Sequence, residues 1–288
     1  MKRILFPTDF SDAANNALNI AMKLSKTLQA ELHVLHSLNS VQQYVDISLT
    51  TAGDITMPGM QPEVVLEAIQ QETDRVNAKM DELEKEIKAV GINVETKVIQ
   101  QALDFEINDI IQENNIDFVV MGTHGSSGIK EAFIGSTAQK IVRIATVPVL
   151  TVNTASDEFN IRRIVCCSDF TEEKINEQLP RVKRFADIFE AELDLVYVNT
   201  PTYFEETKTV LDRMEQVKFD YGLKNCDSHI YNAFDIDEGV INFSEQQNAD
   251  VIAMITHGYR GVKKLFNDNI TESVVNHSEI PVLTLHIH

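Results

Sequence analysis

The sequence contains one unit twice, and this internal repeat limits the possible folds more than any other feature. Several short segments of the first copy return in the same order in the second. The clearest matches are Thr8-Asp9-Phe10 with Ser168-Asp169-Phe170, Thr123-His124-Gly125 with Thr256-His257-Gly258, and Pro148-Val149-Leu150 with Pro281-Val282-Leu283. Repetition in a fixed order indicates a duplicated structural unit. We therefore expect a first domain over residues 1–153 and a second over 161–288, separated by a polar linker.

The first copy is longer than the second. The offset between the copies is 160 residues at Asp9 and 133 residues at His124, so the first copy holds about thirty additional residues. The segment 39–61 contains glycines, prolines and threonines and is the natural place for most of them. A long connection of this kind is uncommon in a compact domain and is often functional. We expect a long surface loop there.

Each copy alternates strand-like and helix-like segments. The strands expected in the first copy are Arg3–Pro7, Glu31–His36, Val94–Ile99, Phe118–Met121 and Val147–Val152. Helices are expected from about Ser11 and over Glu63–Val90, Phe105–Glu113 and Ser136–Ala145. The second copy repeats the strands near 163–167, 192–198, 227–231, 250–254 and 281–287. This alternation predicts an α/β fold with a mostly parallel sheet covered by helices on both faces.

The charge of the chain argues against a nucleic-acid-binding protein. Its 25 basic residues are outnumbered by 44 acidic ones, and the formal net charge is −19. A phosphate backbone requires clustered lysine and arginine, whereas backbone amides can hold a small phosphate ligand without cationic side chains. The sequence shows no signal-peptide or membrane-spanning apolar run, and its three cysteines are no disulfide framework. We expect a cytoplasmic protein that contacts neither nucleic acid nor membrane.

Candidate ligand-binding residues follow two of the expected strands. Ligands of open parallel sheets bind beyond the carboxyl ends of the strands, where the strand order reverses. Asp9 directly follows the first strand, and a segment with glycine at 122 and 125 directly follows the fourth. Nine residues later, Gly135-Ser136-Thr137 opens an expected helix. Glycine lets backbone approach an anion, and a helix start offers amides and, here, two hydroxyl donors. The spacing predicts a phosphate site.

These residues also have ordinary structural interpretations. Glycines after a strand often only make turns, and Asp9 can cap the helix that follows it. His124 can shape its loop or bond a neighbour instead of binding a metal. The spacing differs from the dinucleotide fingerprint, and the sequence contains no Gly-Lys-Ser or Gly-Lys-Thr of a Walker loop. A role in turns alone does not explain why Gly135-Ser136 stands at the start of an expected helix.

Several segments along the chain carry a resemblance to a known family. They are Ile4-Leu5-Phe6-Pro7-Thr8-Asp9-Phe10-Ser11, Leu35-His36, Met121-Gly122-Thr123-His124-Gly125, Gly135-Ser136 and Val147-Pro148-Val149-Leu150. Together they resemble the universal stress protein family, in its ATP-binding branch and its tandem two-domain form. The resemblance covers nearly the whole chain. It implies two tandem Rossmann-like domains of the adenine nucleotide alpha hydrolase type.

The resemblance implies a site for ATP, with Mg²⁺ or Mn²⁺ on the phosphates, in the first domain. Asp9 would lie near the ribose and a phosphate-bound metal. Ser37 stands where family members usually have an aliphatic residue whose backbone reads the adenine edge. The implied cofactor-binding residues are Pro7, Thr8, Asp9, Ser37, Met121, Gly122, His124, Gly125, Gly135, Ser136 and Thr137, and the implied metal ligand is Asp9.

The second copy departs from this pattern. Ile255 replaces the first glycine, Asp268 the third glycine and Asn269 the serine. The carboxylate of Asp268 would stand where the resemblance places the triphosphate, and like charges at that range repel each other. Cys167 stands in the place of Pro7. We expect a degenerate second site.

Three functions compete for this chain. The first is a stress-response regulatory protein that binds ATP through its first domain and acts by a conformational change or on a protein partner that the sequence does not name. The second is a slow ATPase, for which the sequence offers only His124 as a candidate base and Lys130 as a cation in the glycine segment. The third is an interaction scaffold with vestigial sites. The intact spacing of the first copy favours the regulatory protein.

Four further expectations concern architecture. In the fold of this family the last strands, Val147–Val152 and Ile280–Ile287, lie at sheet edges, and exposed edges invite pairing. We expect the copies to pair through them as a pseudo-dimer within one chain, and a homodimer of chains is a further alternative. The helix Glu63–Val90 is expected to be a solvated face and Cys166-Cys167 to be buried. His286 and His288 are expected at a solvated strand end.

Overall fold

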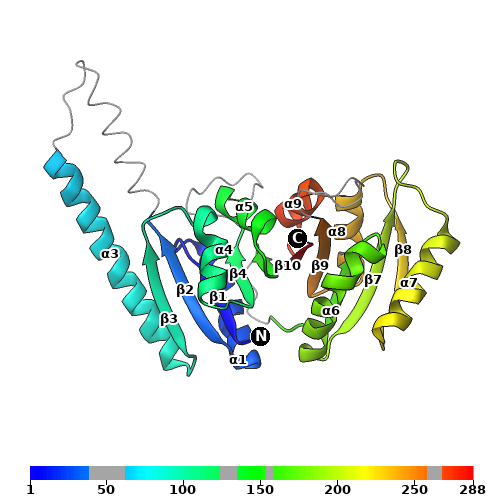
Figure 1. The fold of residues 1–288 in the computed structure, drawn as a ribbon, viewed down its shortest axis with the longest axis horizontal. Coiled ribbons are helices and arrows are strands. Elements are labelled where there is room, and N and C mark those ends of the chain that lie inside the picture. The colour runs from blue at the N-terminus through cyan, green and yellow to red at the C-terminus, as the bar shows by residue number, and fades with distance from the viewer. Residues whose placement is uncertain (39–61, 124–134, 154–158, 258–267, 288) are drawn as a thin grey trace, which may run out of the picture.

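The computed structural model describes residues 1–38, 62–123, 135–153, 159–257 and 268–287, and within them two α/β units follow each other along the chain (Figure 1). The first unit contains β1 (Arg3–Pro7), α1 (Asp12–Leu28), β2 (Glu31–Ser37), α3 (Pro62–Ala89), β3 (Val94–Ile99), α4 (Leu103–Glu113), β4 (Phe118–Gly122), α5 (Ser136–Ile144) and β5 (Val149–Val152). The second unit contains β6 (Arg163–Cys167), α6 (Glu172–Phe189), β7 (Glu192–Asn199), α7 (Thr207–Tyr221), β8 (Ser228–Asn232), α8 (Ile236–Gln246), β9 (Val251–His257), α9 (Asp268–His277) and β10 (Val282–Ile287).

The strands form one continuous sheet in the order β3-β2-β1-β4-β5-β10-β9-β6-β7-β8. The second half of this order mirrors the first, as a duplicated unit requires. Strands within each repeat are parallel, whereas β10 and β5 pair antiparallel with Leu283 opposite Leu150. The pairing of the two repeats through their last strands is therefore confirmed. Both leucines are buried, so the junction belongs to the core of the molecule.

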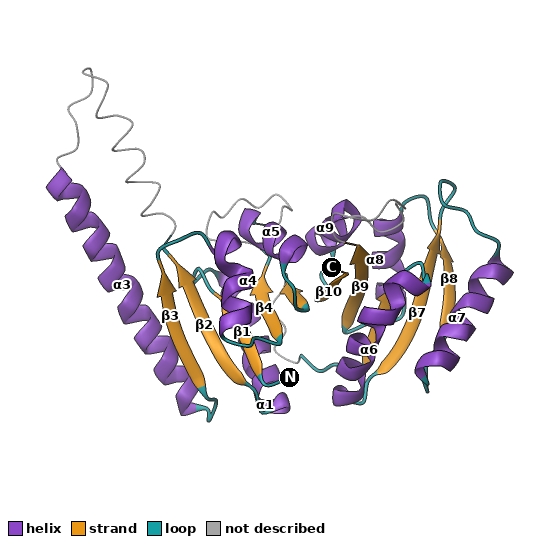
Figure 2. Ribbon diagram, in the orientation of Figure 1, coloured by secondary structure: helices purple, strands orange, loops and turns teal. Residues whose placement is uncertain are grey.

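Helices cover both faces of the sheet (Figure 2). One apolar cluster contains buried residues of α1, α3, α6 and α7, and the cluster on the other face contains buried residues of α4, α5, α8 and α9. Each cluster draws residues from both repeats. Phe118 of the first repeat stacks on Phe185 of the second with 5.6 Å between ring centroids. The mostly parallel α/β architecture predicted from the sequence is confirmed.

The helix after the long connection differs from the expectation of a solvated face. Its bounds, Pro62–Ala89, agree closely with the expected Glu63–Val90. Val76, Met80 and Ile87 are buried, however, and pack in the apolar cluster with α1. These positions recur on one side of a 3.6-residue helix, so the charged composition had hidden a narrow apolar stripe. The helix is solvated on its other sides and covers the outer strand β3 on this one.

Smaller differences concern the element ends. β5 begins at Val149 instead of Val147, and α4 begins at Leu103 instead of Phe105. Phe105 is 80% exposed, whereas Leu103 is buried, so the apolar residue that anchors the start of α4 is Leu103. No helix in the described part of the chain is both long enough and apolar enough to cross a bilayer.

The cysteines are buried, as expected for the adjacent pair. Cys166, Cys167 and Cys226 are buried and take part in no disulfide. Burial raises the pKa of Cys226 to about 12 and moves that of Cys166 in the same direction. Both therefore remain protonated thiols at neutral pH, and the thiolate is the reactive form of cysteine. The expected loop over 39–61 and the side chains of His286 and His288 lie outside the described residues.

Candidate functional site

The candidate site lies at the carboxyl ends of β1 and β4, where the strand order reverses. β1 has β2 on one side and β4 on the other, and Ile4 pairs with Phe118. The chain runs outward from β1 through β2 to β3 and then returns to β4. Such a reversal opens a crevice beyond the strand ends, which is where open parallel sheets bind ligands. Asp9 and Thr123 each follow one of the two strands.

The turn after β1 is closed by side chains. Thr8 Oγ1 accepts a hydrogen bond from the Phe10 amide at 3.0 Å, and Asp9 Oδ1 accepts one from the Ser11 amide at 3.0 Å. Phe10 has a φ of 60°, a left-handed conformation that a phenylalanine adopts only when its surroundings enforce it. Ser11 then caps α1 by accepting from the Ala14 amide at 3.2 Å. Asp9 thus helps to order the start of α1. Asp9 itself is exposed to solvent.

His36 at the end of β2 supports this turn from the side. Its Nδ1 lies 2.8 Å from the carbonyl oxygen of Thr8, and because a carbonyl only accepts, Nδ1 is the protonated nitrogen. The imidazole stacks on Phe10 with 4.8 Å between ring centroids, and Lys79 Nζ lies 4.8 Å from the Phe10 centroid. Burial lowers the pKa of His36, although the bond to Thr8 acts in the opposite direction. The imidazole is therefore neutral at pH 7.

Sequence reasoning did not place Phe10, His36 or Lys79 at the site. His36 was visible only as part of the Leu35-His36 match, and nothing in the sequence indicated its bond to Thr8. Lys79 lies on α3, far from the motif in the chain. The signal that could have found His36 is its position at the end of β2, next to β1 in a parallel sheet.

The Ser37 hydroxyl bonds the segment that connects β3 to α4. Its Oγ donates a hydrogen bond to the carbonyl oxygen of Gln101 at 2.6 Å. Leu38 continues the contact between β2 and β3 by donating its amide to the carbonyl of Ile99 at 2.8 Å. The polar side chain that departs from the family pattern therefore has a structural partner within the first repeat.

Gly122 is required by the packing of α1. A methyl group in place of its hydrogen would lie 2.8 Å from the backbone carbon and oxygen of Ala13. Backbone atoms cannot rotate away as a flexible side chain can, so the first turn of α1 sits against β4 only because residue 122 is glycine. Met121, just before it, is 5% exposed and packs in the core against α4 and α5. Pro7 is buried at the end of β1.

The N-terminus of α5 returns to the end of β4. The Gly135 amide donates a hydrogen bond to the carbonyl oxygen of Thr123 at 2.7 Å. Gly135 is the N-cap residue and has no side chain to bond the first-turn amides. Ser136 and Thr137 follow and are exposed. The helix start therefore directs its amides and the positive end of its dipole to the crevice beside β4. His124 and Gly125 lie outside the described residues.

The second repeat has the same turn with different surroundings. Phe170 has a φ of 55°, and Asp169 Oδ1 accepts from the Thr171 amide at 3.2 Å. Asp169 is only 3% exposed, however. Tyr197 takes the place of His36, is fully buried, and bonds the carbonyl of Tyr203 at 3.0 Å. Burial raises the pKa of Tyr197, so it stays neutral.

Ile255 changes the strand end of the second repeat. It occupies the position of Gly122 and is fully buried in the apolar cluster that contains residues of α6. Where Gly122 admits the backbone of α1, the strand here presents a branched side chain. The helix of the second repeat therefore meets its sheet through side chains instead of through close backbone contact. The side chains of Asp268 and Asn269 are not among those described.

The comparison with known protein families identifies the family of this chain. The model of the universal stress protein family matches residues 1–153 and again residues 160–286. The chain belongs to the universal stress protein family. Universal stress protein MJ0577 of Methanocaldococcus jannaschii is 32% identical over 155 residues, which are 52% of this chain and 94% of the relative. Universal stress protein YxiE of Bacillus subtilis is 31% identical over 151 residues, which are 52% of this chain and 97% of the relative.

A solved structure matches both repeats of this universal stress protein together. The crystal structure of a universal stress protein from Archaeoglobus fulgidus has a TM-score of 0.70 with 20% sequence identity. The match covers 99% of this chain and 98% of that one. At 20% identity this similarity shows a shared fold and nothing further. That fold includes the tandem arrangement of two units in another chain of similar extent.

Proposed function

We propose that this universal stress protein is a regulatory protein that binds one ATP, with Mg²⁺ or Mn²⁺, in its first domain (residues 1–153), while the second domain (161–288) has a degenerate site. The observation that carries the proposal is the bond between the Gly135 amide and Thr123. It brings the start of α5 to the end of β4, beside the turn that contains Asp9. A helix start is a suitable site for phosphate oxygens because its amides have no partners within the helix.

The proposed roles follow from the geometry around this crevice. The amides and hydroxyls of Ser136 and Thr137 would bind the phosphates, and Gly135, whose amide is bonded to Thr123, would let the phosphates approach the backbone. Asp9 is exposed beside them and would bind the metal through its carboxylate. Met121 is buried, so its contact with a nucleoside would have to be made by its backbone. Pro7, Thr8, Gly122 and Ser37 would form the wall of the nucleoside pocket, and His124 and Gly125 would complete the phosphate loop.

Regulation is favoured over turnover by the chemistry of the described residues. Among the described residues, His36 is the imidazole that contacts the turn, and its Nδ1 already donates to Thr8. Its lowered pKa makes it a poor acid at neutral pH. Phosphoryl transfer needs positive charge and a positioned nucleophile. The described part of this site supplies helix amides, the hydroxyls of Ser136 and Thr137 and a metal ligand, and its one cationic side chain among the described residues, Lys79, lies over the ring of Phe10. The output would then come from a change of conformation or of partner affinity.

A pair of matched variants tests the phosphate role. Gly135→Val places a branched side chain at the helix start, and Asp268→Val makes the corresponding change in the second repeat. We expect calorimetric titration with ATP and Mg²⁺ to show at least tenfold weaker binding for Gly135→Val, about 1.4 kcal/mol. Asp268→Val should bind ATP as the native chain does. Equal affinity of a folded Gly135→Val variant would contradict the proposal, and release of phosphate from ATP at a steady rate would replace it with the ATPase.

A further inference from the structure

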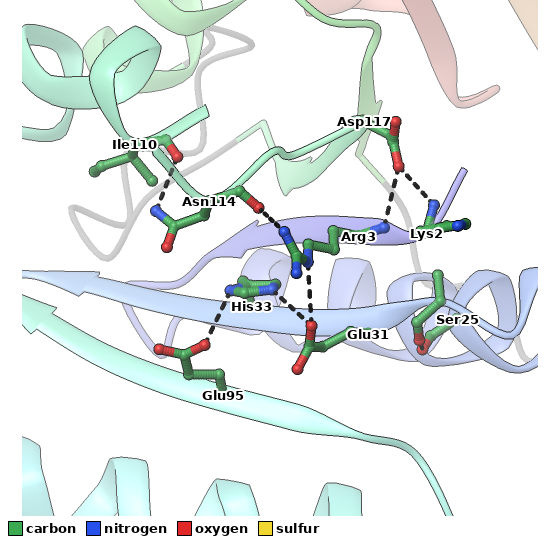
Figure 3. A network of polar contacts seen from close by, with 10 residues as sticks. Lys2, Arg3, Ser25, Glu31, His33, Glu95, Ile110, Asn114 and Asp117 are labelled. Atoms are coloured by element: carbon green, nitrogen blue, oxygen red, sulfur yellow. Dashed lines mark hydrogen bonds and ion pairs between the residues drawn. The ribbon is translucent and has the colours of Figure 1, made fainter. Parts of the chain in front are cut away.

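A cluster of one histidine and two glutamates lies near the amino-terminal ends of β2 and β3, whereas the candidate nucleotide site lies beyond the carboxyl ends of the strands. Glu31 and His33 are on the amino-terminal part of β2, and Glu95 is on β3 directly beside His33 in the strand register. Figure 3 shows the His33 imidazole between the two carboxylates. The cluster faces the end of α4, where Ile110 and Asn114 close it from above. Nothing in the proposed nucleotide function uses these residues.

The His33 imidazole is buried, and its Nε2 makes no hydrogen bond with any of the described residues. The residue is 9% exposed. Nε2 lies 3.3 Å from Glu31 Oε2, and Nδ1 lies 3.6 Å from Glu95 Oε2. A buried polar nitrogen that makes no hydrogen bond costs about 1–3 kcal/mol, and here the carboxylates lie close to the ring without closing such a bond at Nε2. The surroundings of the ring therefore suit a positive species between the imidazole and a carboxylate.

We propose that Glu31, His33 and Glu95 bind one divalent cation of the zinc type. The three side chains each offer one ligand atom within 4.8 Å of the other two. Ligand atoms around a tetrahedral zinc lie about 3.4 Å apart, given bonds of about 2.0–2.2 Å. Movements of about 1 Å would therefore close the site. The glutamate side chains are 39% and 61% exposed and can make that movement, whereas His33 is fixed by burial.

The two carboxylates of the cluster have two basic residues nearby, Arg3 and Lys97, so a cation would be held by its ligand bonds and not by an excess of negative charge. Arg3 Nε lies 3.3 Å from Glu31 Oε2, and its Nη1 donates to the Asn114 carbonyl at 2.8 Å. The guanidinium offsets one carboxylate and orients it. Lys97 lines the same cavity as His33 and Glu95, which has a volume of about 20 Å³. That volume suits a single ion or water. An imidazole with two carboxylates combines ligands that zinc accepts.

The second repeat contains a cluster of the same composition at the corresponding place. Asp194, Asp227 and His229 also offer ligand atoms within 4.8 Å of one another. Asp194 occupies the strand position of His33, and Asp227 directly precedes β8. The imidazole has therefore moved to a different position, while the set of one histidine and two carboxylates is kept. His229 Nε2 is again buried without a hydrogen bond, 3.6 Å from Asp194 Oδ1. Two unbonded imidazole nitrogens at related places support a common use.

Cobalt titration tests the proposal, because Co²⁺ binds zinc sites and absorbs visible light according to its ligands. The measurement uses the full chain carrying His229→Gln, which disables the second cluster. We expect one Co²⁺ per chain, displaced by Zn²⁺, with a spectrum typical of four-coordinate cobalt. His33→Gln or Glu95→Gln in the same background should weaken cobalt binding at least tenfold. His277→Gln, which changes an exposed histidine of α9, should leave it unchanged.

Two results would overturn the proposal. One is the absence of saturable cobalt binding by the His229→Gln chain at millimolar Co²⁺. The other is cobalt binding that the Glu95→Gln variant retains in full. Glu95 is exposed, so its replacement tests the ligand set even where His33→Gln lowers the stability of the fold.

Discussion

Glu272 on α9 accepts a hydrogen bond from Gln139 on α5 across the junction of the two repeats, with 2.5 Å between Oε2 and Nε2. Arg143, one turn further along α5, forms an ion pair with the same carboxylate. The Glu272 side chain is only 9% exposed. A buried charge of the second repeat is thus held by two residues of the first. Because α5 begins at the proposed phosphate site, this helix connects that site to the second repeat.

The first prediction concerns this contact. Glu272→Ala removes the ion pair and the hydrogen bond from Gln139, and bonds to charged groups contribute about 1.5–3 kcal/mol each. We expect the free energy of unfolding in urea to fall by about 3 kcal/mol or more. Lys140→Ala serves as a control because Lys140 pairs with Asp104 within the first repeat and is 56% exposed, so its loss should cost less than about 1 kcal/mol. Equal losses for both variants would contradict the account of the junction.

The second prediction concerns the strand pair that joins the repeats. Leu283 lies opposite Leu150 between β10 and β5, and both are buried. Leu283→Lys would place an ammonium group in this apolar contact, where an unpartnered charge is costly. We expect small-angle scattering to show a larger radius of gyration as the repeats separate. Leu66→Lys, at a position that is 64% exposed, should leave the radius unchanged. A compact Leu283→Lys chain of native stability would refute the pairing.

The third prediction separates two glycines of the same motif. Gly122→Ala forces a methyl group against the Ala13 backbone, and such overpacking costs about 1–3 kcal/mol. We expect a lower melting temperature for Gly122→Ala. Gly135→Val should melt close to the native chain, because its effect is on phosphate binding at the start of α5. Thermal unfolding without nucleotide checks both, and the reverse order of stability would show that the structural roles are assigned wrongly.

The fourth prediction follows from the lowered pKa of His36. The unfolded chain protonates this imidazole at a higher pH than the folded chain does, so stability falls as the pH drops below about 6.5. The stability is complete above that pH and reaches its lower level once the folded protein also binds the proton. His36→Asn retains an N–H donor for Thr8 but does not titrate in this range. Urea unfolding between pH 5 and 7.5 should show a shallower pH dependence for His36→Asn than for the native chain. Identical curves would contradict the role of burial at His36.

The fold was largely predictable because its signals are local or repeated. Short apolar strands such as Arg3–Pro7 and Phe118–Met121 have few alternatives in a chain that alternates with helices, and the repeat predicted the second unit from the first. The pairing of β5 with β10 followed from two apolar edges that needed cover. The buried stripe of α3 was missed because charged residues surround Val76, Met80 and Ile87 in the sequence.

The candidate site was predictable in its motif and less so in its geometry. The sequence indicated Asp9 and Gly135, since both stand at strand or helix ends. It did not indicate that Gly122 serves the approach of α1, because that reason lies in Ala13, a residue far from it in the chain. Nor did it indicate the contact of His36 with Thr8, which depends on the register of β2 beside β1. Contacts between distant segments decide such roles, and one sequence does not display them.

The stoichiometry of ATP binding tests the central claim most directly. The full chain, freed of nucleotide, is titrated with ATP and Mg²⁺ in a calorimeter, and the nucleotide carried by untreated protein is identified by mass spectrometry after acid extraction. We predict one ATP per chain, with binding weakened at least tenfold by Gly135→Val and unchanged by Asp268→Val. Two equivalent sites per chain, or no binding of any adenine nucleotide, would contradict the account.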